Sequence, residues 1–247
     1  TATAKPLDKV SLAKLQAGLR YLRVGSGAEE LESKLLNYWI AIEYLFSSHD
    51  ASLDKTSRLQ EYFNKIHSLS YATRLFQDLH KSIASLSLQT NFSLYDPTEC
   101  NYLSQVITVK ESATIVDDDP LVFYRVNTLN ERFKDFKAIK GELERHQLNL
   151  QRNLLRIYRI RNEIVHSAAK DKNIADTTAH LKYYLIFVIN GFIDFIINHP
   201  IDLDEDGSIS IDDYFHISKI KMESLLISKT VTLSQLLAVS NRIDYLN

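Results

Sequence analysis

Residues that interrupt helices are rare in this sequence, since its 247 positions include only six Gly and four Pro. A fold made of many short strands needs turn residues about every ten positions. Apolar side chains instead recur at the three- and four-residue spacing of one helix face, for example at Leu12, Leu15, Leu19 and Leu22. The sequence therefore predicts an all-α protein built from long helices.

Stretches with this spacing are separated by breaks, and each predicts one helix. The predicted helices span residues 10–24, 28–48, 52–69, 70–88, 128–140, 142–169, 174–198, 215–228 and 233–245. Gly25-Ser26-Gly27 is expected to end the first helix, Gly141 to interrupt the long pair, and His199-Pro200 to stop the helix before it. Residues 91–98 predict a loop, and 102–109 predict a helix or a short strand. The sequence shows no segment typical of a linker between domains. We therefore expect a single domain over 1–247, with a core at about 28–198 and a C-terminal extension at 199–247.

The composition, 45% hydrophobic and 24% charged, is typical of a soluble globular protein. A net charge of -2 argues against a globally basic nucleic-acid-binding surface but is compatible with a local basic site. Cys100 is the only cysteine, which excludes an internal disulfide and a cysteine-based zinc site and suits a reducing cytosol. The apolar stretch 181–197 holds Lys182, Asn190 and Asp194, which favours a buried core helix over a membrane span. We therefore expect a cytoplasmic protein without a signal peptide or membrane contact.

The segment Arg161–His166 places a permanent cation, an amide and an imidazole within six residues of a predicted helix. Arginine forks onto phosphate oxygens, and histidine exchanges a proton near neutral pH. Together they suit phosphodiester chemistry, because one group steadies the developing charge while the other moves the proton. The structural alternative is a histidine bonded to a carbonyl at a helix end and an arginine paired with a carboxylate.

Several polar residues share one stripe of this predicted helix. They are Arg152, Arg156, Arg159, Asn162, Glu163 and His166. Arg161 lies off the stripe, about 140° from His166 around an ideal helix. Three alternatives stay open: the helix distorts near His166, the long Arg161 side chain wraps round, or two copies of the motif combine in a symmetric dimer.

The pattern Arg161-Asn162-x-x-x-His166 resembles the R-x(4–6)-H motif of the HEPN superfamily. Residues Tyr158–Ser167 resemble its Apea-like branch most, and the apolar run Tyr38–Phe46 resembles the early helix of that branch. The similarity covers roughly residues 28–198. It implies an antiparallel helical bundle that dimerises across the motif helices. Since the chain begins with Thr1 rather than Met, we also expect a trimmed chain or the C-terminal module of a longer protein, with a regulatory partner or an N-terminal domain.

Active members of that superfamily are endoribonucleases that need no metal or other cofactor. The resemblance implies that His166 deprotonates the ribose 2′-hydroxyl or protonates the leaving 5′-oxygen, that Arg161 holds the phosphate, and that Asn162 positions either one. It also implies RNA as the substrate, a 2′,3′-cyclic phosphate and a 5′-hydroxyl as products, and a role in prokaryotic defence or as a toxin. The arginines at 152, 156 and 159 are candidates for RNA binding. The alternative is a bundle without catalysis that binds RNA, a nucleotide or a protein.

Glu43 is the only charged residue in the apolar run Tyr38–Phe46. A buried carboxylate is costly unless it is paired. One interpretation is a surface glutamate that reaches water. The other is a partner that fixes the geometry of Arg161 or His166.

The segment 202–213, DLDEDGSISIDD, resembles an EF-hand calcium loop. Asp202, Asp204 and Asp206 fall at positions 1, 3 and 5, Gly207 at 6 and Asp213 at 12. Aspartate in place of glutamate at position 12 shortens a ligand, and the sequence has no second such loop with which this one could pair. The alternatives are a weak calcium site, which would define a calcium-dependent interaction module, and an acidic Asp-Gly turn without a metal.

Overall fold

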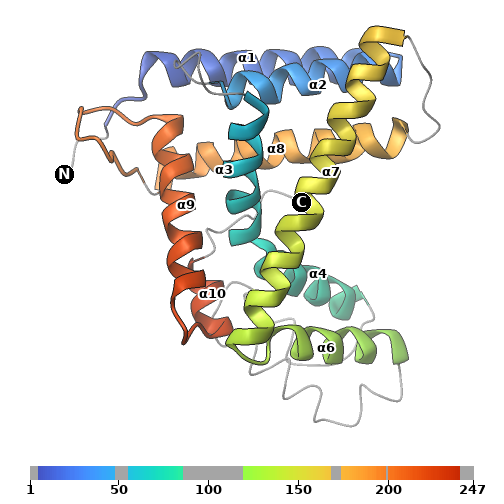
Figure 1. Cartoon of the computed structure of the whole chain (residues 1–247), viewed down its shortest axis with the longest axis vertical. Helices are drawn as coiled ribbons and strands as arrows, with labels where there is room; N and C mark the ends of the chain where they lie inside the picture. Colours follow the sequence, from blue (N-terminus) through green and yellow to red (C-terminus); the bar gives the residue numbers. More distant parts are fainter. Residues whose placement is uncertain (1–4, 48–54, 86–118, 168–173, 199, 240–247) are drawn as a thin grey trace. The chain divides into compact units, whose positions relative to one another are not determined.

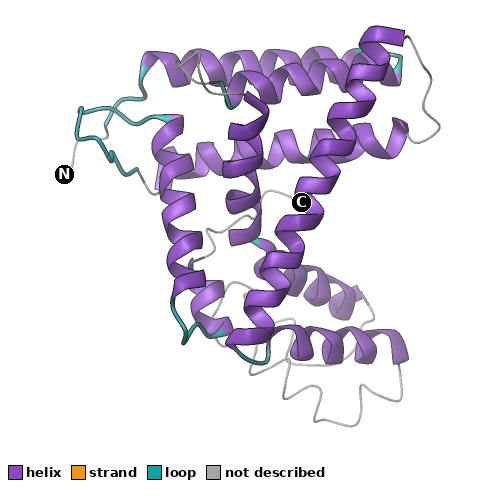
Figure 2. Ribbon diagram, in the orientation of Figure 1, coloured by secondary structure: helices purple, strands orange, loops and turns teal. Residues whose placement is uncertain are grey.

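The structure, a computed structural model, describes residues 5–47, 55–85, 119–167, 174–198 and 200–239. Every regular element in these ranges is a helix, which confirms the all-α prediction (Figure 1 and Figure 2). The helices are α1 (Lys9–Gly27), α2 (Leu31–Leu45), α3 (Lys55–Leu69), α4 (Tyr71–Ser85), α6 (Pro120–Phe133), α7 (Phe136–Ser167), α8 (Ile174–Asn198), α9 (Ile211–Ile227) and α10 (Leu233–Val239). The segments 91–98 and 102–109 lie outside the described residues.

The chain divides into two compact units. Unit 1 comprises residues 1–66 and 148–219, and unit 2 comprises residues 67–147 and 220–247. Helices α3, α7 and α9 each contribute residues to both units. The single domain with a core at 28–198 stays a prediction.

Helix α8 forms the centre of unit 1. Helix α2 packs against both α1 and α8, and the three lie side by side in Figure 1. Aromatic side chains fill the layer between them and α9, where Tyr214 contacts Phe192 and Phe195 at ring distances of 5.9 and 5.6 Å. By length and composition α8 is also apolar enough to cross a bilayer, and 56% of its most apolar window is buried inside the protein.

Helix α1 ends within the glycine-containing segment that was predicted to end it. Asp8 caps its start by accepting the backbone N–H groups of Val10 and Ser11, and the helix then continues to Gly27. The Gly25–Gly27 segment therefore does end the helix, but at its last residue, three positions after the predicted end at Val24. Gly25 is required for close packing, because a Cβ there would lie 2.6 Å from Cε1 of the buried Tyr38.

Unit 2 has its own apolar core, formed by α4, α6, α10 and the adjoining parts of α3, α7 and α9. Asp119 caps α6, and Pro120 occupies its first turn, where proline is well tolerated. The predicted break at Gly141 was wrong, since α7 runs through that residue. The bounds predicted for the preceding helix, 128–140, were also wrong, because α6 runs from Pro120 to Phe133. The break falls at residues 134–135, where Asp135 accepts the backbone N–H of Ala138 at 2.8 Å.

Candidate functional site

The motif residues lie in the last turns of α7, in unit 1. This helix is α-helical from Phe136 to Ser167, so the alternative in which the helix distorts near His166 was wrong. Arg161 and His166 therefore leave the helix in directions about 140° apart.

One face of α7 is fixed in the bundle. Leu154, Ile157 and Ile160 are buried there, as the apolar spacing predicts. Asn153 donates a hydrogen bond of 2.7 Å to the hydroxyl of Tyr184 on α8. These contacts set the rotation of α7 and so decide which side chains face outward.

The three motif residues differ in their exposure to solvent. His166 is exposed, whereas Arg161 and Asn162 are half-buried. Nη1 of Arg161 donates a hydrogen bond of 2.9 Å to Oδ1 of Asn162, so the structure joins two of the three predicted catalytic residues. His166 stands more than one turn further along the helix, with its imidazole accessible to a ligand.

Three further arginines extend this polar surface along the helix. Arg152, Arg156 and Arg159 are all exposed, as the stripe pattern predicts. They make one stripe of α7 a local basic surface on a chain of net charge -2. Such a surface attracts a polyanion without requiring a basic protein overall.

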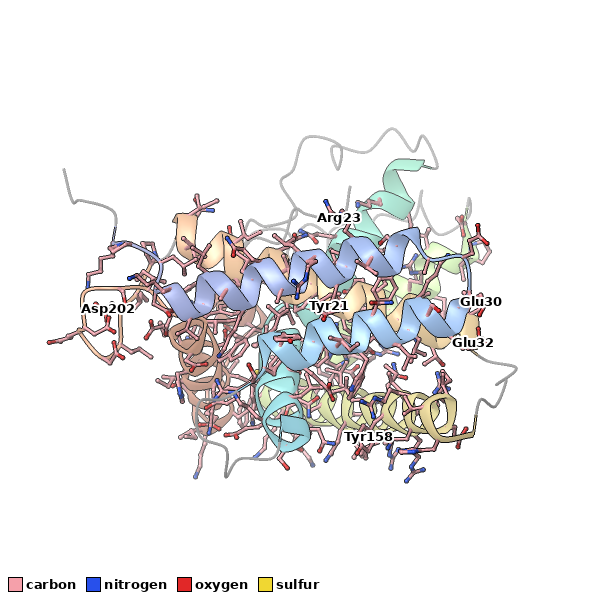
Figure 3. All side chains as sticks on the ribbon, turned by 90° about the horizontal axis from the view of Figure 1, so that it is seen from above. Tyr21, Arg23, Glu30, Glu32, Tyr158 and Asp202 are labelled. Carbon is pink, nitrogen blue, oxygen red and sulfur yellow. The ribbon has the colours of Figure 1, made fainter. Side chains whose placement is uncertain are left out.

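Glu43 is linked to α7 through an aromatic pair. Its Oε1 accepts the indole N–H of Trp39 at 2.7 Å, and the Trp39 ring lies 5.8 Å from the ring of Tyr158, which Figure 3 labels on α7. Among the described residues, Glu43 therefore reaches the motif helix through Trp39 rather than by bonding Arg161 or His166. A positioning role for Glu43 stays a prediction.

The acidic loop brings together three of its four predicted ligands. Oxygens of Asp202, Asp204 and Asp206 lie within 4.8 Å of one another. Asp213 has a different role, since its two oxygens accept the backbone N–H groups of Leu203 at 3.1 Å and Ser210 at 2.7 Å.

Unit 2 contains a polar cluster that the sequence did not predict. His67 is buried, and its Nδ1 lies 3.0 Å from Nε2 of His146 and 2.8 Å from Nη2 of Arg74. Tyr71 stacks on His146 at 3.8 Å and donates a hydrogen bond of 2.8 Å to Glu142. No local spacing signals this cluster, because its two histidines are 79 residues apart.

The environment of the cluster keeps both histidines neutral. Burial, and then the positive charge of Arg74, hold the pKa of His67 well below its usual range. Burial also lowers the pKa of His146 to about 3. The hydrogen bond from Nη2 of Arg74 to Nδ1 of His67 agrees with a neutral His67. A guanidinium can only donate, so the ring nitrogen that accepts must carry a free lone pair. Burial and the bond to Glu142 raise the pKa of Tyr71 to about 12.

Comparison of the chain with protein-family models, with curated proteins and with solved structures found no significant match.

Proposed function

We propose that the chain is a metal-independent endoribonuclease of the HEPN type, acting in a cytoplasmic prokaryotic defence or toxin system. The observation that carries this proposal is the exposed imidazole of His166 at the end of α7, following the hydrogen-bonded pair Arg161 and Asn162. The resemblance of residues 158–167 to the Apea-like motif supports the same assignment.

The chemistry needs only the substrate and these side chains. His166 takes the proton of the ribose 2′-hydroxyl, whose oxygen forms a bond to phosphorus while the bond from phosphorus to the 5′-oxygen breaks. The proton passes to the leaving 5′-oxygen, which yields a 2′,3′-cyclic phosphate and a 5′-hydroxyl. Arg161 stabilises the additional negative charge on the phosphoryl oxygens, and Asn162 holds the Arg161 guanidinium in place.

The angle between the two key side chains supports a homodimeric site. On a straight helix Arg161 and His166 diverge by about 140°, so one copy does not aim both at the same phosphate. Two α7 helices related by a twofold axis would place the arginine of one copy beside the histidine of the other. RNA would then enter along the exposed Arg152, Arg156 and Arg159 of each copy.

Cleavage of single-stranded RNA in EDTA tests the proposal, with the native chain compared with His166→Ala. The matched control is His180→Ala, which removes an exposed histidine from α8 in the same unit. We expect cleavage with cyclic-phosphate ends by the native chain and the control, and at least about a hundredfold loss in His166→Ala. Equal cleavage by all three proteins would overturn the assignment of His166.

A second candidate function is RNA binding without catalysis, which the exposed arginine stripe favours. A pure binder would bind RNA and leave it intact, and His166→Ala would bind as well as the native chain. Replacing Arg152, Arg156 and Arg159 by Gln would weaken binding to all sequences alike. It would also reduce the slope of log affinity against log salt by about 0.7 per lost phosphate contact on single-stranded RNA. An unchanged slope would place the RNA elsewhere.

A further inference from the structure

The loop between α8 and α9 folds around its three acidic side chains. Figure 3 labels Asp202 on this loop. Each carboxylate accepts a backbone N–H group of the loop: Gly207 donates to Asp202 at 3.0 Å, Asp206 to Asp204 at 3.4 Å, and Ser208 to Asp206 at 2.8 Å. Gly207 has a φ of 90°, which suits the glycine expected at position 6 of a calcium loop.

One carboxylate is enclosed and incompletely satisfied. The side chain of Asp202 is 0% exposed, and its Oδ1 has no hydrogen-bond partner. A buried acceptor without a partner is costly, and a carboxylate oxygen more so than a neutral one. One oxygen from each of Asp202, Asp204 and Asp206 lies within 4.8 Å of the other two, so the enclosed carboxylate of Asp202 belongs to a group that concentrates negative charge.

One ammonium group lies against this acidic cluster. The Nζ of Lys5 is 2.7 Å from Oδ2 of Asp202. One ammonium therefore balances only part of the charge on three carboxylates.

We propose that this loop binds a calcium ion through the carboxylates of Asp202, Asp204 and Asp206 and the carbonyl oxygen of Ser208. Oxygen ligands in a flexible loop suit Ca²⁺, whereas Mg²⁺ demands a tighter octahedron. Asp213 stays with the backbone N–H groups of Leu203 and Ser210, so the site has fewer ligands than a complete EF-hand. Its dissociation constant is accordingly in the range of about 10⁻⁴–10⁻³ M.

The N-terminal segment supplies what a second loop would otherwise provide. Ile209, at position 8, forms a parallel bridge with Leu7, in which the N–H of Ile209 donates to Pro6 at 2.8 Å and that of Asp8 donates to Ile209 at 2.9 Å. A single loop is therefore supported without a paired one. Lys5 occupies the same carboxylate as the metal, and the bound cation displaces it.

Isothermal titration calorimetry with CaCl2 on the full chain, freed of metal by chelator, tests this site. We expect one calcium per chain for the native protein, and affinity reduced by more than about tenfold in Asp204→Asn/Asp206→Asn. Asparagine keeps the acceptors of the loop, and circular dichroism confirms that the variant is folded. The matched control is Glu205→Gln, which removes one charge from an exposed side chain of the same loop and stays within about threefold of the native affinity.

Thermal unfolding gives a second measurement, in which calcium at ten times its dissociation constant raises the Tm of the native chain by about 3 °C. An unchanged Tm together with no heat of binding overturns the proposal. Loss of affinity in Glu205→Gln equal to that in the double variant also overturns it, since the loop would then attract cations by charge alone. A titration with MgCl2 that binds as tightly as CaCl2 overturns the choice of calcium.

Discussion

The indole N–H of Trp39 donates to Oε1 of Glu43 one turn later on α2, at 2.7 Å. Trp39 is 1% exposed, so this carboxylate satisfies a donor that has no access to water. The relationship gives a structural reason for a charged residue in the apolar run 38–46. It also holds the ring of Trp39 against Tyr158 of the motif helix.

Glu43→Ala is expected to lower the free energy of unfolding by about 1–3 kcal/mol, because it leaves the indole N–H unsatisfied. Glu43→Gln keeps an acceptor and is expected to cost less. The effect of Glu43→Ala should shrink in a Trp39→Phe background, which lacks the donor. Denaturant unfolding followed by circular dichroism measures the native chain, the three single variants and the double variant. Equal effects in both backgrounds would mean that the hydrogen bond does not stabilise the fold.

Gly25→Ala is expected to destabilise unit 1 by about 1–3 kcal/mol, because the new methyl group overlaps the ring of Tyr38. The helix propensity of alanine opposes this effect by about 1 kcal/mol. Gly27→Ala, on the same helix, has nothing within 4 Å of its new Cβ and should be neutral or slightly stabilising. Thermal unfolding of the two variants compares them directly, and a stable Gly25→Ala would show that Tyr38 moves aside at little cost.

The free energy of unfolding is expected to fall as the pH falls from about 6.5 toward 3. His67 and His146 have lowered pKa values in the folded chain, so over this interval the unfolded chain holds protons that the folded chain lacks. Arg74, Tyr71 and Glu142 are the charged and titratable groups around them. Each histidine contributes a slope of about 1.4 kcal/mol per pH unit, and its stabilisation is complete above the unfolded pKa.

The dependence of the free energy of unfolding on pH tests whether His67 and His146 cause this acid sensitivity. His67→Gln/His146→Gln should flatten the dependence of stability on pH between 7 and 5, measured by denaturant unfolding at each pH. His180→Gln, at an exposed position, should leave the slope as it is. A double variant with the native slope would assign the acid sensitivity to other groups.

Lys5→Gln is expected to raise the affinity for calcium severalfold, since it removes the ammonium that competes for Asp202. Lys9→Gln removes the same charge from an exposed position at the start of α1 and should change the affinity little. Calorimetric titration distinguishes the two variants. Weaker binding in Lys5→Gln would show that the lysine supports the loop rather than competing with the ion.

Sequence spacing predicted most of the helices because their apolar stripes are local. Helix α8 has the predicted bounds, and the polar stripe of α7 is exposed as expected. The errors lie at helix ends, at Gly141 and in the bounds of the helix predicted at 128–140, which runs instead from Pro120 to Phe133. At Gly25 the helix continues because the missing side chain leaves room for the ring of Tyr38, a contact that the local sequence does not show.

The candidate sites were predictable to the same extent. The motif at 161–166 and the loop at 202–213 are contiguous, so their residue types were visible in the sequence. The role of Asp213 was not, because backbone donors in its own loop compete for its carboxylate. The pair formed by His67 and His146 required the fold of unit 2, which alone brings these two side chains together.

The bridge between Leu7 and Ile209 has a consequence for biosynthesis. Residues 5–8 leave the ribosome long before residue 209 has been made. The segment before α1 therefore lacks its bridge to Ile209 during most of translation. The hydroxyl of Ser11 likewise lacks its donor until late in translation, since its oxygen accepts the backbone N–H of Ile211, 200 residues later. We therefore expect these contacts between the N-terminal segment and residues 209–211 to form among the last steps of folding.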